Sequence, residues 1–295
     1  MVGARALSGQ ADADVVGDTS GRDLVFTDRD FVRIRGLIHA RAGIALAEHK
    51  TEMAYSRLAR RLRALRLTRF DDYLGLLETS PAHPEWEHFV NALTTNLTAF
   101  FREAYHFPLL AAHARNRRRP LAVWCCAAST GEEAYSIAMT LVETLGERAA
   151  SASILASDID TRALARAQAG IYPLAEVEKL SETRRKRFFQ RGSGTRAGLA
   201  RVTPALRSMI EFRPLNLRTH DWDLSGPFDA IFCRNLMIYF DQATQKALLD
   251  RFAALIAPDG LLFAGHSENF SGLTSAFTLR SHTVYERAAR VRVAS

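Results

Sequence analysis

Residues 127–133, Ala-Ala-Ser-Thr-Gly-Glu-Glu, have the composition of a turn that binds a small molecule. They follow an apolar run and open a segment of helical periodicity, which is where parallel α/β sheets bind their ligands. The small side chains and Gly131 let the backbone approach a ligand, although the pattern is looser than GxGxxG. Glu132 and Glu133 cancel the preference of a helix N-terminus for anions, so the turn suits a pyrophosphate poorly. A cation without phosphate, such as S-adenosylmethionine, fits these residues better than NAD or ATP.

A second ligand-binding position is predicted in the segment 156–160, at the end of the next apolar run. Asp158 lies 27 residues after Gly131. Dinucleotide-binding folds place the carboxylate that holds the ribose hydroxyls about 20 residues beyond the glycine-rich turn. We therefore predict that Asp158 binds a ribose. Asp160 directly precedes a helical segment and is predicted to cap that helix.

Hydrolysis and metal catalysis have little support in the sequence. The segment His266-Ser267-Glu268 contains a nucleophile, but the GxSxG turn that would activate it is absent. The nine histidines are scattered without HExxH or comparable spacing, so no metal site is predicted. The cysteines fit neither a disulfide framework nor a CxxC site and are expected to be buried small residues. They are Cys125, Cys126 and Cys233.

Strand-like apolar runs alternate with helical segments after residue 120, which predicts a parallel sheet with helices on both faces, an α/β doubly wound domain over residues 121–290. Between residues 184 and 214 the alternation fails and glycines interrupt short apolar runs, so we predict an inserted antiparallel β element there. The predicted strands are 121–127, 154–156, 228–233 and 260–264, and the predicted helices are 132–145, 161–169 and 242–256.

Residues 24–92 are predicted to form a small all-helical domain, preceded by a flexible tail over residues 1–23 and followed by a linker over residues 93–120. Between residues 31 and 69 there are ten basic and two acidic residues. Apolar residues at helical spacing in this stretch predict one amphipathic helix, with Tyr55, Leu58, Leu62 and Leu65 on its inner face. Its outer, solvent-facing arc is predicted to carry four arginines: Arg57, Arg60, Arg63 and Arg66.

The composition of the 295 residues is that of a soluble globular protein, with 47% apolar and 24% charged residues. The net charge of +7 indicates an acidic partner, which could be nucleic acid, an anionic membrane surface or an acidic protein. No apolar run approaches the roughly 18 residues that a spanning helix needs, and no signal peptide is evident. We therefore expect a cytoplasmic protein.

Five segments carry a family resemblance. They are residues 92–103 (ALTTNLTAFFRE), 128–133 (ASTGEE), 156–161 (ASDIDT), 228–240 (FDAIFCRNLMIYF) and 265–269 (GHSEN). Together, in order and spacing from about residue 26 to residue 285, they resemble the CheR family of chemotaxis receptor methyltransferases. One departure is the pair Cys125-Cys126 in the first strand, where small residues such as Ser or Ala are expected.

The resemblance implies a Rossmann-like methyltransferase domain that takes S-adenosylmethionine, releases S-adenosylhomocysteine and needs no metal. It implies that Arg102 and Tyr239 serve catalysis, with Tyr239 beside the reacting methyl group. It also implies cofactor contacts from the linker, from the turn at Glu133 and from the loops that follow later strands. These residues are Asn96, Thr98, Arg102, Glu133, Asp158, Asn216, Leu217, Asn235 and Leu236.

The implied substrates are glutamate side chains on the cytoplasmic helices of methyl-accepting chemotaxis receptors, with the enzyme recruited to membrane receptor arrays. We assign the basic helix to this acidic surface rather than to nucleic acid. In the family, an insert such as residues 184–214 adds a receptor's C-terminal peptide as an extra strand, and we predict the same here.

Two other functions remain open on the residues alone. A nucleic-acid methyltransferase could also use the basic helix, although the segment 234–237 lacks an Asn-Pro-Pro-Tyr type signature. A non-catalytic protein could use the cofactor as a signal. The site residues implied by the resemblance also have structural explanations: Asn96 and Thr98 could be helix caps, Tyr239 a core aromatic residue, and Arg102 a surface ion-pair partner of Glu103.

Overall fold

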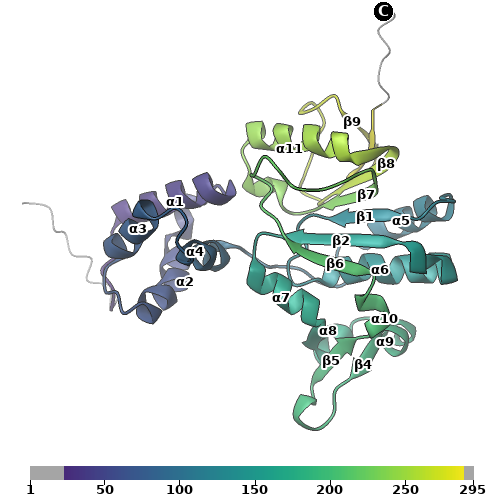
Figure 1. The fold of residues 1–295 in the computed structure, drawn as a ribbon, viewed down its shortest axis with the longest axis horizontal. Helices are drawn as coiled ribbons and strands as arrows, with labels where there is room; N and C mark the ends of the chain where they lie inside the picture. Colours follow the sequence, from purple (N-terminus) through teal and green to yellow (C-terminus); the bar gives the residue numbers. More distant parts are fainter. Residues whose placement is uncertain (1–22, 289–295) are drawn as a thin grey trace, which may run out of the picture.

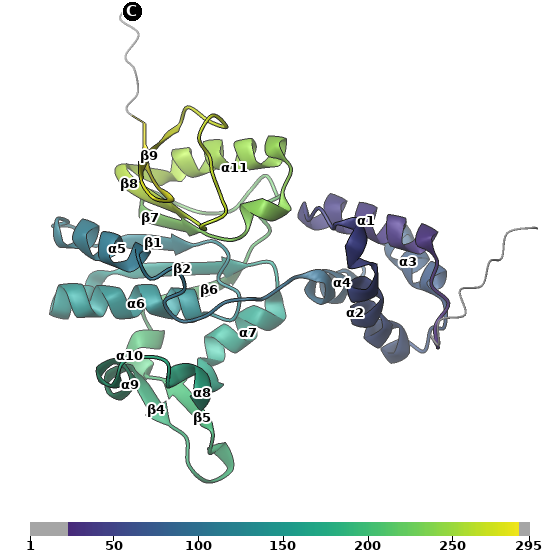
Figure 2. The ribbon, with the colours of Figure 1, turned by 180° about the vertical axis from the view of Figure 1, so that it is seen from behind.

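A computed structural model describes residues 23–288, and shows three parts (Figure 1). A bundle of four helices lies to one side of a seven-stranded sheet, and a smaller three-stranded sheet projects from its lower edge in that view. Seen from behind, the bundle and the smaller sheet remain separate lobes of the molecule (Figure 2). The flexible tail predicted over residues 1–23 lies, apart from Asp23, outside the described residues.

The N-terminal helices enclose a single apolar core, as the sequence predicts. Helix α1 begins with a capping box, in which the Thr27 hydroxyl accepts from the Asp30 N–H and the Asp30 carboxylate accepts from the Thr27 N–H. It ends at Gly43, whose φ of 76° suits glycine. The elements are α1 (Asp28–Ala42), η1 (Glu48–Lys50), α2 (Thr51–Ala64), α3 (Phe70–Thr79) and α4 (Glu85–Leu93).

The large sheet has the strand order β6-β2-β1-β7-β8-β10-β9. Strands β6 through β8 in that order are parallel, whereas β10 is antiparallel to both neighbours. Among the parallel strands, chain order runs outward on both sides of the boundary between β1 and β7, and such a switch point is where open α/β sheets bind ligands. The strands are β1 (Ala122–Cys125), β2 (Ser153–Asp158), β6 (Ile210–Pro214), β7 (Phe228–Cys233), β8 (Ile256–Ala264), β9 (Phe277–Ser281) and β10 (Val284–Arg287).

Helices cover both faces of the large sheet, which confirms the doubly wound architecture. Val123 and Cys125 of β1 pack in the core beneath α5 and α6, whereas Trp124 and Cys126 pack in the core beneath α11. All three cysteines are buried and free. The helices are α5 (His106–Arg115), α6 (Glu132–Leu145), α7 (Thr161–Ala169) and α11 (Gln242–Leu255), with short turns η2 (Gly146–Ser151) and η4 (Met237–Tyr239).

The segment predicted as a linker, residues 93–120, is only partly a linker. Its second half contains α5, which packs through Phe107, Leu110 and Ala114 into the core that α6 also lines. The extended part that joins the two domains is therefore short, and it runs from the end of α4 to the start of α5. Helix α5 was not predicted from the sequence.

The predicted insert exists but its bounds differ from 184–214. Its antiparallel sheet has the order β3-β5-β4, and β3 begins at Ile171, before the predicted start. Residues 208–212, predicted within the insert, instead lie mainly in β6, the edge strand parallel to β2. A short edge strand buried on one side gives a weak sequence pattern, so the two sheets were not separated. The elements are β3 (Ile171–Pro173), α8 (Leu174–Val177), α9 (Glu182–Phe188), β4 (Phe189–Arg191), η3 (Gly194–Arg196), β5 (Leu199–Val202) and α10 (Pro204–Arg207).

Candidate cofactor and active site

A cavity of about 420 Å³ lies at the carboxyl ends of β1, β2 and β7, at the switch point of the large sheet. Its walls come from the end of α1 with the loop behind it, from the linker after α4, and from the loops that follow β1, β2, β6 and β7. All ten residues predicted for cofactor binding or catalysis line it. They are Asn96, Thr98, Arg102, Glu133, Asp158, Asn216, Leu217, Asn235, Leu236 and Tyr239.

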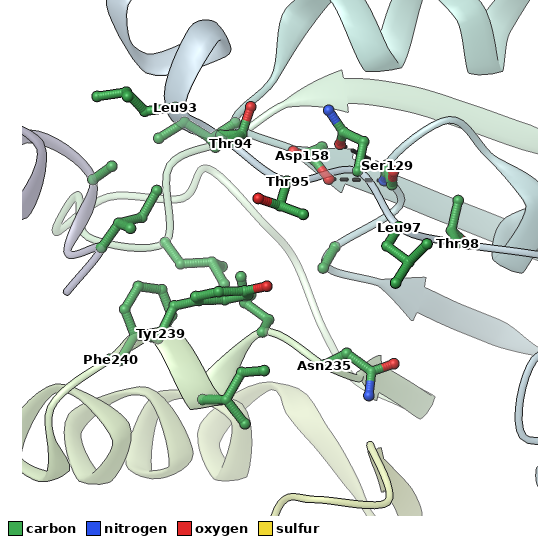
Figure 3. Close-up of a pocket in the computed structure, with 18 of the residues that line it drawn as sticks. Leu93, Thr94, Thr95, Leu97, Thr98, Ser129, Asp158, Asn235, Tyr239 and Phe240 are labelled. Atoms are coloured by element: carbon green, nitrogen blue, oxygen red, sulfur yellow. Dashed lines mark hydrogen bonds between the residues drawn. The ribbon is translucent and has the colours of Figure 1, made fainter. Parts of the chain in front are cut away.

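Figure 3 shows the linker residues Thr94, Thr95 and Thr98 along one wall of this cavity, near Asp158. Tyr239 and Asn235 lie along the opposite wall, and the Tyr239 hydroxyl points into the space between the walls. Residues from segments far apart in the chain therefore face the same cavity.

The turn after β1 is shaped by close approach of neighbouring elements. Gly131 has a φ of 99°, and a Cβ there would lie 2.8 Å from the Ala167 Cβ and 2.9 Å from the Tyr172 hydroxyl. Only glycine combines this conformation with this contact. Ser129, which also has a positive φ of 49°, donates its N–H to the Asp158 carboxylate at 2.8 Å. The turn is thus held against the end of β2.

Asp158 and Asp160 have different roles: Asp160 caps a helix, as the sequence predicts, and Asp158 lines the cavity. The Asp160 carboxylate accepts from the N–H groups of Arg162 and Ala163 at 3.0 Å, so Asp160 is confirmed as the cap of α7. Asp158 is held by the N–H groups of Ser129 and Asp160 and lines the cavity, and burial raises the pKa of its carboxyl. Its place suits a ribose acceptor, which stays a prediction.

The linker is hydrogen-bonded to the sheet domain through Asp160. The Thr94 hydroxyl and the Asn96 amide both donate to the Asp160 carboxylate, at 2.7 and 2.8 Å. The side-chain amide oxygen of Asn96 in turn accepts from the Ser129 hydroxyl at 3.0 Å. Asn96 is therefore fixed in orientation at the cavity wall. Arg102 donates from its guanidinium to the Leu97 carbonyl at 2.7 Å, which holds its side chain beside the same wall.

A buried charge network lies behind the linker. The Arg234 side chain, 1% exposed, donates to the Glu133 carboxylate at 2.6 Å and lies 3.1 Å from the Glu103 carboxylate. Burial raises the pKa of Glu133 although Arg234 opposes the shift. For Glu103, burial is outweighed by hydrogen bonds from His266 and by Arg234, which lower its pKa to about 2. Glu133 thus lines the cavity with the Arg234 guanidinium directly beside its carboxyl group.

The helical domain closes the cavity on its far side. The Ala45 N–H donates to the Tyr239 carbonyl at 2.9 Å, and the Asn216 amide donates to the Arg41 carbonyl at 2.8 Å. A Cβ at Gly43 would lie 2.7 Å from the Arg218 side chain, so the end of α1 packs closely on the sheet domain. The two domains form one binding site, because residues of both line the cavity.

The arginines of the predicted basic helix do not form the continuous exposed arc that was predicted. Helix α2 ends at Ala64, so Leu65 and Arg66 lie beyond it, and Leu65 is 36% exposed rather than on the inner face. Arg57 is half-buried and donates to the Thr94 carbonyl at 2.6 Å, which places it behind the linker. Arg60 and Arg63 are exposed on α2, and Arg63 pairs with Asp23 at 2.9 Å.

Three residues that support the site were not predicted from the sequence. Arg234 and Glu103 form the buried network described above, and Glu268, predicted only as part of a loop, is buried and bonded to the backbone after β7. The signal for Arg234 and Glu268 was a charged residue directly after, or just beyond, the apolar end of a strand, residues 230–233 in β7 and 261–264 in β8. Such a residue must find partners when the strand end is buried.

Between residues 23 and 288, no group of three or more His, Cys, Asp or Glu side chains is arranged to hold a metal ion. None of the helices in that range is long and apolar enough to cross a membrane.

Two family profiles together match nearly the whole chain, one over each domain. The profile described as "CheR methyltransferase, all-alpha domain" matches residues 29–94, and that described as "CheR methyltransferase, SAM binding domain" matches residues 96–286. The boundary between the two profiles falls in the linker, next to Asn96.

Curated relatives extend the match. The chemotaxis protein methyltransferases of Klebsiella aerogenes and Escherichia coli are each 57% identical over 262 residues, covering 89% of this chain and 90% and 92% of theirs. Chemotaxis protein methyltransferase 2 of Pseudomonas aeruginosa is 53% identical over 266 residues, covering 89% of this chain and 94% of its own. The profile identifies the cofactor of the cavity as S-adenosylmethionine, and its carboxylates Asp158 and Glu133 fit a cationic ligand with a ribose. The chain is an S-adenosylmethionine-dependent methyltransferase, and it belongs to the CheR methyltransferase family.

Proposed function

We propose that this protein transfers the methyl group of S-adenosylmethionine to glutamate side chains of chemotaxis receptors, giving methyl esters. The observation that carries the proposal is the match, over about nine-tenths of both chains, with relatives named chemotaxis protein methyltransferase. The cavity adds support, because it brings together every residue predicted for the cofactor and the reaction.

The nucleophile needs no activation by a base. A glutamate side chain has an unperturbed pKa of about 4.3, so it is already a carboxylate at neutral pH. S-Adenosylmethionine, when bound, supplies an electrophilic methyl group. What the protein must supply is alignment of the carboxylate oxygen with that group.

Tyr239 and Arg102 are placed to provide this alignment. The Tyr239 hydroxyl points into the cavity and can donate a hydrogen bond to the incoming carboxylate (Figure 3). Arg102 lines the same cavity, where a guanidinium can orient the substrate carboxylate or the carboxylate of the cofactor. Strong pairing would weaken the nucleophile, so the proposed role of both residues is orientation.

The substrate surface is proposed on the helical domain. Of the four predicted arginines, Arg60 and Arg63 present exposed charge on α2, and Arg66 is exposed just beyond it. Acidic receptor helices that lie along this face gain association rate and specificity from complementary charge. Arg57, which is bonded to the Thr94 carbonyl, would contribute to this surface only in part, because its guanidinium already supports the linker.

The insert is proposed as a separate docking site for a receptor's C-terminal peptide, which would recruit the enzyme to membrane receptor arrays. Strand β4 is an edge of the three-stranded sheet, and an edge strand can accept an added strand. The Gly192 N–H donates to the Leu199 carbonyl of β5, and the Phe188 carbonyl accepts from the N–H of Thr203, the residue after β5. In an antiparallel pair the hydrogen-bonding residues alternate, so the Arg191 N–H faces away from β5. The other edge, β3, carries Pro173, which has no N–H to donate.

A paired substitution at Arg191 tests the docking site. Arg191→Pro removes the outward N–H, whereas Arg191→Ala keeps it and removes only the side chain. We expect the proline variant to methylate receptors with a C-terminal tether more slowly, with unchanged affinity for S-adenosylhomocysteine. Equal rates for both variants and the parent would exclude peptide pairing at β4. Deleting the insert is a poorer test, because Tyr172, Phe189 and Val202 belong to the main core.

The substrate class is tested by offering a choice. The enzyme is incubated with labelled S-adenosylmethionine and either receptor fragments or random duplex DNA. Label in the receptor fragment supports the proposal. Label in DNA would favour a nucleic-acid methyltransferase, and binding of the cofactor without transfer to either would favour a cofactor-sensing protein.

A further inference from the structure

Three consecutive backbone N–H groups after β7 converge on one buried carboxylate. The N–H groups of Leu236 and Met237 donate to Oε1 of Glu268 at 2.9 and 2.7 Å. Those of Asn235 and Gly265 donate to Oε2 at 3.0 and 2.5 Å. Glu268 is 4% exposed, so these four donors replace the water that its charge would otherwise bind.

The backbone conformation explains why the donors converge. Asn235 is left-handed, with a φ of 56°, and Leu236 is right-handed, with φ and ψ of −118° and −43°. Residues of alternating hand turn successive N–H groups to one side and form a concave anion site. In this protein the anion is a side chain of the chain itself. Asn adopts the left-handed conformation more readily than other residues except glycine, and the carboxylate of Glu268 supplies the hydrogen bonds that hold it in this loop.

The loop so held is a wall of the cofactor cavity. It carries Asn235, Leu236 and, through η4, Tyr239, all of which line the cavity, whereas Glu268 does not. The fit around Asn235 is tight, because a Cβ on Gly265 would overlap its amide and lie 2.9 Å from the Glu268 carboxylate. The side-chain amide group of Asn235 also donates to the Glu103 carboxylate at 3.2 Å, so this side chain has one defined orientation.

We propose that Glu268 is a positioning residue of the cofactor site, holding the backbone of residues 235–237 in the conformation that presents Asn235 and Leu236 to S-adenosylmethionine. It acts through the loop and touches neither cofactor nor substrate. The inference rests on cofactor binding and not on the receptor as substrate, so its test needs no receptor.

Glu268→Gln is the direct test. Glutamine keeps the shape but replaces one acceptor oxygen by an amino group, so two of the four N–H groups face a donor. We expect the Kd for S-adenosylhomocysteine, measured by calorimetry well below the melting temperature, to rise about tenfold or more. Glu268→Asp keeps the charge on a shorter side chain and should give a Kd between those of the parent and Glu268→Gln.

Asp229→Asn is the matched control. Asp229 is a fully buried carboxylate at the opposite end of β7, where it accepts from the Ala122 N–H at 3.0 Å and pairs with Arg119. This variant should lower the melting temperature and leave the Kd unchanged. If Glu268→Gln behaves like the control, with a lower melting temperature and a parental Kd, the role is purely structural and the proposal is overturned.

Hydrogen exchange of the unmodified protein covers the case in which Glu268→Gln does not fold. The amides of Asn235, Leu236 and Met237 should exchange slowly, and S-adenosylhomocysteine should slow them further. Exchange at the rate of unprotected loop amides would overturn the proposal independently of any variant.

Discussion

The charges of the cofactor cavity and those of helix α2 are fixed by the fold to very different degrees. Arg234 is 1% exposed and shared between Glu133 and Glu103, whereas the pair of Arg63 with Asp23 is 53% and 59% exposed. Buried charges with several partners have one geometry, and losing a partner is costly. Exposed ion pairs contribute roughly 0 to 1 kcal/mol to stability, and their attraction weakens as the salt concentration rises. Cavity substitutions should therefore impair the reaction under all conditions, and surface substitutions only at low salt.

Arg102→Ala should give the largest effect, a fall in kcat on the order of a hundredfold, because alignment of the carboxylate is the main catalytic demand. The protein should stay folded, since Arg102 is half-buried and donates its guanidinium hydrogen bond to the nearby Leu97 carbonyl. Steady-state kinetics on receptor fragments measure this. Arg115→Ala, an exposed arginine at the end of α5, is the control and should match the parent. Near-parental turnover of Arg102→Ala would remove Arg102 from the mechanism.

Asp158→Ala should weaken cofactor binding by about 1.5 to 3 kcal/mol, the usual worth of a hydrogen bond to an ionised group. That is roughly a ten- to 150-fold rise in Kd, measured by calorimetry with S-adenosylhomocysteine. Part of the loss comes from the N–H groups of Ser129 and Asp160, which lose their acceptor. Asp158→Asn should give a Kd between those of the parent and Asp158→Ala. An affinity equal to the parent's in both variants would show that the ribose is held elsewhere.

Reversing Arg60 and Arg63 to Glu should raise the KM for receptor by roughly two- to tenfold at low salt, and by less at high salt. Affinity for S-adenosylhomocysteine should not change, because neither residue lines the cavity. The measurement is receptor KM against ionic strength. Normal methylation by the double variant at low salt would make α2 only a solvated face, and the substrate surface would have to be sought on another element.

Glu103→Gln should have the smallest effect on the reaction, because Glu103 does not line the cavity, and its effect on stability should be visible in the pH dependence of the melting temperature. The folded-state pKa of Glu103 is about 2, against an ordinary value of 4.5. A lowered pKa adds stability above pH 4.5, which is lost as pH falls toward 2. The difference in melting temperature between parent and variant should therefore be largest near neutral pH and shrink below pH 4.5. A difference that stays constant from pH 7 to pH 3 would contradict the ion-pair account.

The sequence predicted the parallel sheet and its helices closely, because strand runs and helical periods are local patterns. Helices α6 and α7 occupy the predicted residues, and the Asp160 cap is where its position before α7 placed it. The cavity residues were predicted largely through the family resemblance, which supplied the pairing of distant segments. Without it, nothing in the local pattern brings Asn96 to Asp160, 64 residues later.

What the sequence could not give depends on contacts between distant residues. Arg234 and Glu133 are 101 residues apart, and Glu268 reaches back 31 to 33 residues to the loop after β7. The helical position of Arg57 faces outward from the core and therefore predicts a surface cation, yet the carbonyls of Ala92 at the end of α4 and of Thr94 in the linker cover that side. The predicted boundary of the insert was wrong because β6 pairs with β2 through long-range hydrogen bonds, which a short apolar run does not reveal.

One measurement tests the central claim directly. Receptor-containing membranes are incubated with the protein and S-adenosylmethionine labelled in its methyl group, and the receptor is then treated with mild base. The account predicts label on receptor glutamates that base releases, as expected for a methyl ester, with little label when Asp158→Ala replaces the parent. Label that resists base, or that does not depend on the glutamates, would contradict it.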